Sequence, residues 1–209
     1  MDTAVALVQA YLRVNGYFTV AEFPVVEAAG GTHRTLTDID ILAFRFPGAG
    51  REIGGIGRKT VDAERHTPDA FLGQSGDQSD MIVGEVKEGR ARLNQSARDP
   101  SVLRSALVRF GCCAPHEAGD IVSELTRRGR TTTEGGHHIR LVVFGSTMDE
   151  EKGGEGFTFV PLGHVTEFLQ NHLREHWDLV RHVQTKEPVL GFLLTLEKAR
   201  RGMDRSTSS

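Results

Sequence analysis

The stretch Ser79–Gly89 reads Ser-Asp-Met-Ile-Val-Gly-Glu-Val-Lys-Glu-Gly. Its apolar run ends in Glu85-Val86-Lys87, which predicts a buried strand that carries an acid and a base. Because side chains alternate across a strand, Glu85 and Lys87 point to the same face, about 6.5–7 Å apart along the chain. Charges on a buried strand are costly unless they pair or bind something, so the stretch predicts a site as well as a strand.

A second apolar run contains acids of its own. It reads Thr-Asp-Ile-Asp-Ile-Leu-Ala-Phe over residues 37–44, with Asp40 inside the run. Asp38 has the same strand parity as Asp40, and it is either a further ligand or a solvated residue at the start of the strand. Two carboxylates and a lysine suit a divalent metal that acts on a phosphodiester.

This combination resembles the active-site signature of the PD-(D/E)xK nuclease superfamily, which includes restriction endonucleases and Holliday-junction resolvases. The resemblance covers roughly the first half of the chain. It implies that Asp40 and Glu85 bind Mg²⁺, with Mn²⁺ as a substitute, and that the carbonyl of Val86 completes the metal shell. It also implies that Lys87 positions the attacking water. The expected reaction is hydrolysis of a phosphodiester bond in DNA, with RNA as the alternative substrate.

The chain departs from the family pattern in three places. Ile39 stands where the family has proline, and 45 positions separate Asp40 from Glu85, more than a usual hairpin needs. Relatives often place a further acid on the first helix, but the predicted helix here contains none. We consider Glu27, Glu22 and Asp38 as the additional acid.

The order of predicted elements favours an α/β protein with a mixed β-sheet flanked by α-helices, the order of the restriction-endonuclease-like fold. The predicted helices are Thr3–Val14, Pro100–Phe110, Glu117–Arg128, His164–Trp177 and Val189–Arg200. The predicted strands are Tyr17–Glu27, Leu36–Phe46, Met81–Val86, Ile139–Phe144 and Phe157–Leu162. A polar turn is predicted over Arg130–His138.

Length and composition predict one domain over residues 1–201, with an insertion at about 48–79 and a disordered tail over 202–209. The insertion is rich in glycine and is expected beside the active face. No apolar run reaches 18 residues and the start lacks a basic segment, so we expect no membrane span and a cytoplasmic protein. The adjacent Cys112 and Cys113 are not expected to bridge.

The net charge of −3 excludes a generally basic nucleic-acid binder, but the charge is uneven along the chain. Nine basic and six acidic residues lie between positions 85 and 130. Eight of the nine basic residues are arginine, whose planar guanidinium binds phosphate through two hydrogen bonds and therefore more specifically than lysine does. We expect Arg90, Arg92, Arg58 and Lys59 to contact nucleic acid. The alternative is that the basic residues of this region only form a solvated surface of helices. A double-strand cut would need two sites, so a homodimer or a recognition partner is expected.

Two other functions stay open at this point. A catalytically inactive member of the same fold could bind nucleic acid or a protein partner without cutting. Alternatively, His172-Leu173-Arg174-Glu175-His176 matches the His-x-x-Glu-His pattern of inverted zinc proteases, in which His172 and His176 hold zinc and Glu175 is the base. That reading needs a further acidic ligand among the few residues downstream.

Overall fold

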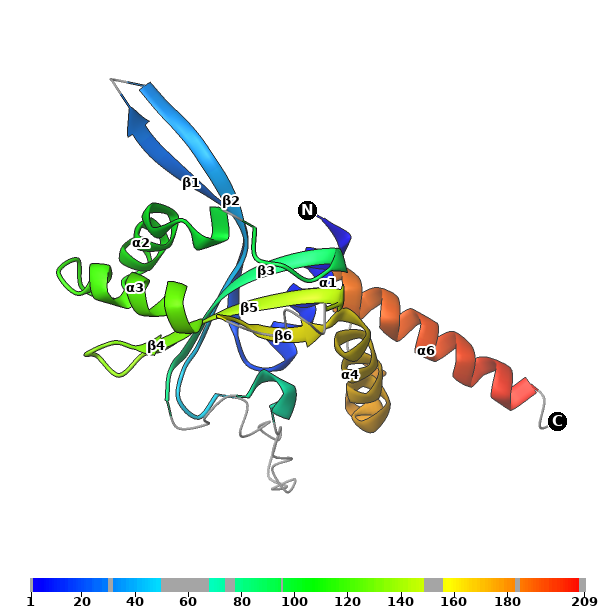
Figure 1. The fold of residues 1–209 in the computed structure, drawn as a ribbon. Helices are drawn as coiled ribbons and strands as arrows, with labels where there is room; N and C mark the ends of the chain where they lie inside the picture. Colours follow the sequence, from blue (N-terminus) through cyan, green and yellow to red (C-terminus); the bar gives the residue numbers. More distant parts are fainter. Residues whose placement is uncertain are drawn as a thin grey trace.

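The computed structural model describes residues 2–29, 32–49, 68–73, 78–94, 96–148, 156–182 and 185–206. In chain order its elements are α1 (Thr3–Val14), β1 (Phe18–Ala29), β2 (Thr32–Arg45), η1 (Ala70–Leu72), β3 (Asp80–Arg90), η2 (Ser96–Arg98), α2 (Pro100–Arg109), α3 (Ala118–Arg128), β4 (Arg130–Thr132), β5 (His138–Thr147), β6 (Thr158–Pro161), α4 (Leu162–Glu175), α5 (Trp177–Val180) and α6 (Pro188–Ser206) (Figure 1). No helix in these ranges is long and apolar enough to cross a membrane.

The strands of the described residues form one six-stranded mixed sheet. The order is β1-β2-β3-β5-β4, and β6 also pairs with β5. β1, β2 and β3 make an antiparallel meander, whereas β5 runs parallel to β3. Parallel neighbours need a crossover, and α2 and α3 supply it. The result is the predicted α/β class, a mixed sheet flanked by helices.

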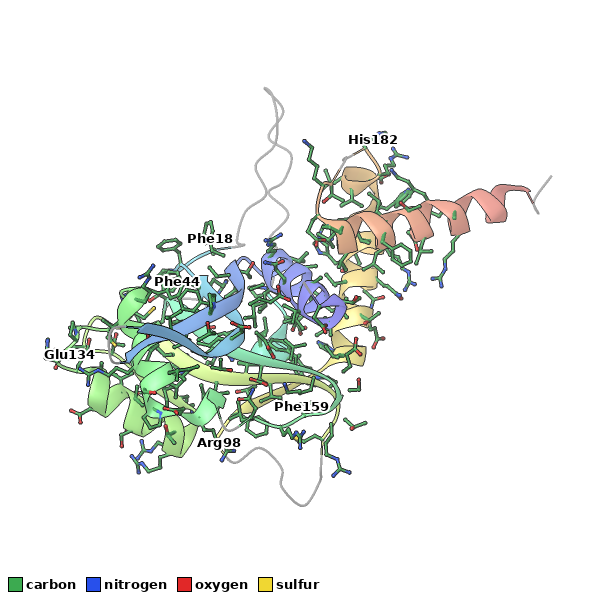
Figure 2. The ribbon with its side chains drawn as sticks, turned by 90° about the horizontal axis from the view of Figure 1, so that it is seen from above. Phe18, Phe44, Arg98, Glu134, Phe159 and His182 are labelled. Carbon is green, nitrogen blue, oxygen red and sulfur yellow. The ribbon has the colours of Figure 1, made fainter. Side chains whose placement is uncertain are left out.

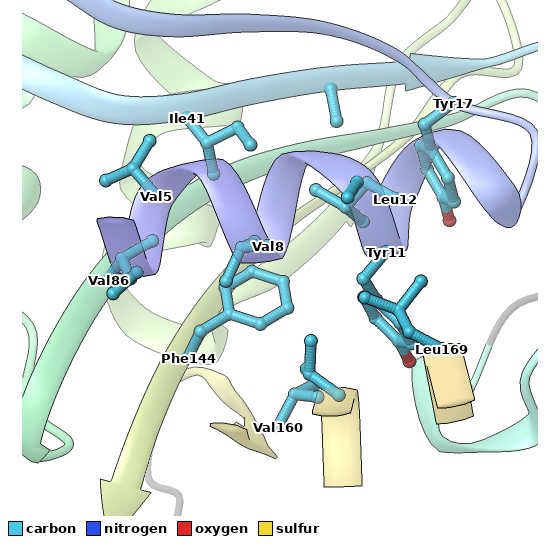
Figure 3. Close-up of a cluster of buried hydrophobic side chains, with 14 of the residues drawn as sticks. Val5, Val8, Tyr11, Leu12, Tyr17, Ile41, Val86, Phe144, Val160 and Leu169 are labelled. Atoms are coloured by element: carbon cyan, nitrogen blue, oxygen red, sulfur yellow. The ribbon is translucent and has the colours of Figure 1, made fainter. Parts of the chain in front are cut away.

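Helices cover both faces of the sheet, as the apolar residues on both strand parities predict. On one face α1, α4 and α6 build a core around Tyr11 and Phe144 (Figure 3). On the other face α2 and α3 build a second core around Leu103 and Leu125. Alternate residues of β3 are divided between the two cores, with Ile82 in the first and Val83 in the second.

Asp80, at the start of β3, belongs to a buried ion network on the α1 face. Arg140 donates to both carboxylate oxygens of Asp80, at 2.9 and 2.8 Å, and His138 contacts the same group at 3.1 Å. Burial alone would raise the pKa of Asp80, but the hydrogen bonds from His138 and Arg140 lower this pKa to about 2. The network therefore joins the beginnings of β3 and β5 through a charge pair that is fully ionised at neutral pH.

The predicted insertion falls partly outside the described residues, which omit 50–67 and 74–77. Within it the structure describes residues 48–49, 68–73 and 78–79, and the part over 68–73 packs on the α1 face. Asp69 accepts hydrogen bonds from Tyr11 Oη at 2.7 Å and lies 2.5 Å from His164 Nε2, and its backbone N–H donates to Asn15 Oδ1 at 2.7 Å. This part of the segment is therefore fixed to α1 and α4.

Two element predictions need correction. The polar turn expected over Arg130–His138 begins with a short strand, β4, because Thr131 is buried and pairs with β5 while its hydroxyl donates to Glu124. The tail expected to be disordered from residue 202 is helical as far as Ser206, where α6 ends, and its last residues, 207–209, lie outside the described residues. Arg201 lies 4.3 Å from the centre of the Trp177 ring and 2.8 Å from Glu197, and both contacts favour the helical conformation there.

Candidate functional site

The strands that carry the predicted carboxylates separate at a fork in the sheet. β2 pairs with β3 from Arg45–Asp80 to Ile41–Gly84, and the pairing ends one position before Asp40 and Glu85 would face each other. Beyond this point the β1–β2 hairpin turns away from β3 (Figure 1). Past the fork, β2 still pairs with β1 and β3 with β5, but the backbone groups that face the gap between β2 and β3 need partners from side chains or solvent.

Asp40 supplies one of these partners. Its Oδ2 accepts a hydrogen bond from the backbone N–H of Val86 at 2.7 Å. The bond ties β2 to β3 across the fork and fixes the carboxylate of Asp40 next to the row of side chains that contains Glu85. The second oxygen, Oδ1, makes no hydrogen bond to any described residue.

Glu85 is only 2% exposed and is held in the same way, by one oxygen. Its Oε1 accepts a hydrogen bond from Asn94 Nδ2 at 2.7 Å and lies 2.5 Å from Lys87 Nζ. Its Oε2 has no hydrogen-bond partner among the described residues.

The electrostatics of this group, which we call the acid–lysine cluster (Asp40, Glu85 and Lys87), favour an added cation. Burial raises the pKa of the Glu85 carboxyl, and the neighbouring Asp40 carboxylate raises it further. Lys87 and Asn94 act in the opposite direction by stabilising the charged form. A single lysine balances two carboxylates, so the cluster keeps a net negative charge that a divalent cation would neutralise.

The space beside Glu85 is small. Segments from β2, β3 and the chain around Leu93 and Ala97 enclose a hollow of about 10 Å³, which Asp38 also lines. Such a volume accepts one water or ion and excludes a nucleotide base. Larger hollows of about 860 and 450 Å³ lie elsewhere, between α3, β4 and β6 and beside Phe18 and Phe44. A large substrate would therefore meet the cluster from its outer side, where Lys87 is 32% exposed.

No protein-family model, curated protein or solved structure matches this chain. The geometry of the acid–lysine cluster is therefore the basis for any statement about its function.

The three acids considered as additional ligands lie in different surroundings. Asp38 is exposed and lines the same hollow as Glu85, so the fold brings it close to the cluster. Glu22 lies in β1 between the paired residues Ala21 and Phe23 and has a φ of 52°, and its carboxylate accepts a hydrogen bond from the backbone N–H of Asp2 at 2.9 Å. Glu27 pairs with Arg34 in the hairpin through its backbone, and its side chain lies outside the description.

The predicted cations are only partly covered by the structure. Arg90 and Arg92 are exposed where β3 ends and the chain turns back, beyond Lys87. Arg58 and Lys59 lie outside the described residues. Arg98 was not singled out from the sequence, but η2 places this exposed residue one position beyond Ala97, which lines the hollow beside Glu85. Figure 2 shows it well apart from Phe18 and Phe44.

The alternative zinc site gains no further ligand from the described residues. The rings of His172 and His176 are 4.4 Å apart at the end of α4, and Nδ1 of His176 is 2.9 Å from the carbonyl oxygen of His172. Downstream, Glu197 is bound to Arg201 and Glu187 accepts from the backbone N–H of Leu190. No group of three or more His, Cys, Asp or Glu side chains in the described ranges could hold a metal by itself.

Asn94 is a residue of the site that the sequence did not predict, because it donates a hydrogen bond to Glu85. Its Oδ1 accepts a hydrogen bond from the backbone N–H of Ala97 at 2.6 Å, at the start of η2. Asparagine is a favoured residue at helix starts, so the sequence Asn-Gln-Ser-Ala indicates this local turn. The bond to Glu85 joins residues nine positions apart and depends on how the chain folds back, which no local pattern indicates.

Proposed function

We propose that this chain is a Mg²⁺-dependent nuclease of the PD-(D/E)xK type that hydrolyses phosphodiester bonds in DNA. One observation carries the proposal. Asp40 and Glu85 meet at the fork, each is anchored through one oxygen, and each leaves the other oxygen without a hydrogen-bond partner among the described residues. Two carboxylate oxygens completed by water and substrate phosphate form the kind of shell that Mg²⁺ prefers.

The element order supports the restriction-endonuclease-like form of the α/β fold. An opening helix, an antiparallel meander of three strands, and a helical crossover to a strand parallel to the third follow one another along the chain. This support is at the level of the fold, so the chemistry rests on the cluster itself.

Each residue of the cluster has a distinct role in the proposed reaction. Asp40 and Glu85 hold the cation, and the carbonyl of Val86 remains the predicted additional ligand. A bound divalent cation would lower the pKa of a coordinated water and neutralise charge on the leaving oxygen. The ammonium of Lys87 lies next to Glu85 and is partly exposed, so it can orient the attacking water and offset the charge on the phosphate. Arg90, Arg92 and Arg98 are exposed in the segment that follows Lys87, and in this proposal they contact the phosphates of the substrate.

Cleavage of labelled duplex, single-stranded and branched DNA, and of RNA, tests the proposal. We expect cutting in Mg²⁺ or Mn²⁺ and none in EDTA, and Lys87→Ala should lower the rate by about 10²–10³-fold, as for other groups that stabilise the charge of a transition state. Lys198→Ala, on the exposed side of α6, is the control and should cut like the wild type. Cutting that survives Lys87→Ala would place the activity elsewhere. Absence of both cutting and metal binding in the wild type would favour a non-catalytic binding module.

A further inference from the structure

Asn94 lies at the inner side of the segment that follows β3 and touches the acid–lysine cluster directly. Its side-chain amide donates to Glu85 Oε1 at 2.7 Å, and the asparagine is half-buried. Lys87 contacts the same oxygen at 2.5 Å. Both donors therefore converge on Oε1, and Oε2 is the atom left for another partner.

The orientation of this amide is fixed by local structure. Because Asn94 Oδ1 accepts a hydrogen bond from the backbone N–H of Ala97 at 2.6 Å, the opposite end of the amide, Nδ2, has to face Glu85. The segment itself is held against β5. The N–H of Ala91 donates to the carbonyl of Thr147 at 2.7 Å, and a Cβ added at Gly145 would lie 2.8 Å from the Cβ of Ala91.

Asn94 and Lys87 differ in how firmly they can hold Glu85. The Lys87 side chain is 32% exposed and ends in a flexible ammonium, whereas Asn94 is bound at both ends of a short amide. A lysine that turns toward water or phosphate during a reaction would leave Oε1. The amide of Asn94 keeps Oε1 satisfied at that moment, so the rotation of the carboxylate does not change.

We infer that Asn94 is a positioning residue, which fixes the rotation of the Glu85 carboxylate and directs Oε2 toward a bound divalent cation. The inference rests on the proposed function of the cluster and adds a residue that the predicted signature does not contain. Removal of a group that hydrogen-bonds to a metal ligand and orients it typically lowers metal affinity or activity by about 10–100-fold. We expect a loss of that size for Asn94 variants.

Two variants distinguish the proposed role of Asn94 in positioning Glu85 from its role in the local structure around Ala97. Asn94→Leu removes both hydrogen bonds, whereas Asn94→Ser retains a favoured cap for the N–H of Ala97 but is too short to reach Glu85. Asn171→Ser, on the exposed side of α4, is the matched control. The readouts are the Kd for Mn²⁺ by calorimetry on the whole protein, its thermal unfolding midpoint, and the cleavage rate as a function of Mn²⁺ concentration.

We expect both Asn94 variants to bind Mn²⁺ about 10–100-fold more weakly than the wild type. Their cleavage rates should recover toward the wild-type value at saturating Mn²⁺, and the unfolding midpoint of Asn94→Ser should stay near that of the wild type. An Asn94→Ser variant that binds Mn²⁺ like the wild type would overturn the inference and leave Asn94 as a cap only. A wild type that binds no Mn²⁺ would instead overturn the proposed function.

Discussion

At the scale of single residues, the acid–lysine cluster depends on how each carboxylate divides its two oxygens. Asp40 uses Oδ2 to hold the N–H of Val86, and Glu85 uses Oε1 to hold Asn94 and Lys87. The remaining oxygens keep their capacity to bind a cation. A purely structural ion pair would be expected to satisfy all of these atoms within the protein, because unpaired polar atoms in a nearly buried group are costly.

Asp80 and Arg140 form such a structural pair, and its contribution to stability can be measured. Asp80→Asn leaves the guanidinium of Arg140 buried beside a neutral partner, so we expect a loss of about 3–5 kcal/mol in the free energy of unfolding at pH 7. Urea unfolding of the wild type and the variant measures this difference. Asp178→Asn, at a carboxylate that is 88% exposed, should change the stability by less than about 1 kcal/mol.

The same pair predicts a pH dependence. The pKa of Asp80 is lowered from 3.8 to about 2 in the folded protein, so its contribution to stability is fully present above pH 3.8. That contribution is lost as the pH falls from 3.8 through about 2. The stability difference between the wild type and Asp80→Asn should therefore be constant from pH 7 to 5 and shrink below pH 4. A difference that stays constant down to pH 2 would contradict the assignment.

At the scale of elements, the fork between β2 and β3 creates the site. The alternation of side chains along Met81–Lys87 could be predicted from the sequence, and so could the shared face of Glu85 and Lys87. The point at which β2 leaves β3 could not be predicted, because β2 is apolar on both sides of Asp40 and local pattern does not reveal where pairing ends. The fold-back that brings Asn94 to Glu85 was missed for the same reason.

Gly84 permits the close approach of β2 and β3 at the fork. A Cβ at this position would lie 2.5 Å from Ile41 Cγ2, and Ile41 is fully buried, so Gly84→Ala has to push the two strands apart. We expect it to destabilise the protein by about 1–3 kcal/mol and to lower cleavage, because Asp40 moves relative to Val86. Chemical unfolding and cleavage rates measure both effects.

Gly163→Ala in α4 is the control for this change. A Cβ there meets no atom within 4 Å, and alanine is the better helix former, so the variant should be more stable by about 0.5–1 kcal/mol with unchanged cleavage. Equal stability and equal cleavage in Gly84→Ala and Gly163→Ala would mean that the close contact at the fork has no importance.

At the scale of the whole molecule, the two cores and the mixed sheet are what bring distant residues together. Asp40 and Val86 are 46 positions apart, and pairing of β2 with β3 makes them neighbours. The α/β class and the main helices could be predicted from periodicity and end signals, as with Pro100–Arg109 after the cap Asp99. The location of the segment around Asp69 could not, since its contacts with Tyr11 and His164 depend on the tertiary fold.

The most direct test of the central claim is the rate at which Asp40→Asn cuts labelled DNA over a range of Mg²⁺ concentrations. Asparagine can still accept the hydrogen bond from Val86, so the variant removes the charge and leaves the fork intact. We predict that the wild type cuts only with a divalent cation and that Asp40→Asn is slower by about 100-fold or more, while Asp120→Asn, exposed on α3, cuts normally. An Asp40→Asn variant that cuts as fast as the wild type would contradict the assignment of the metal site.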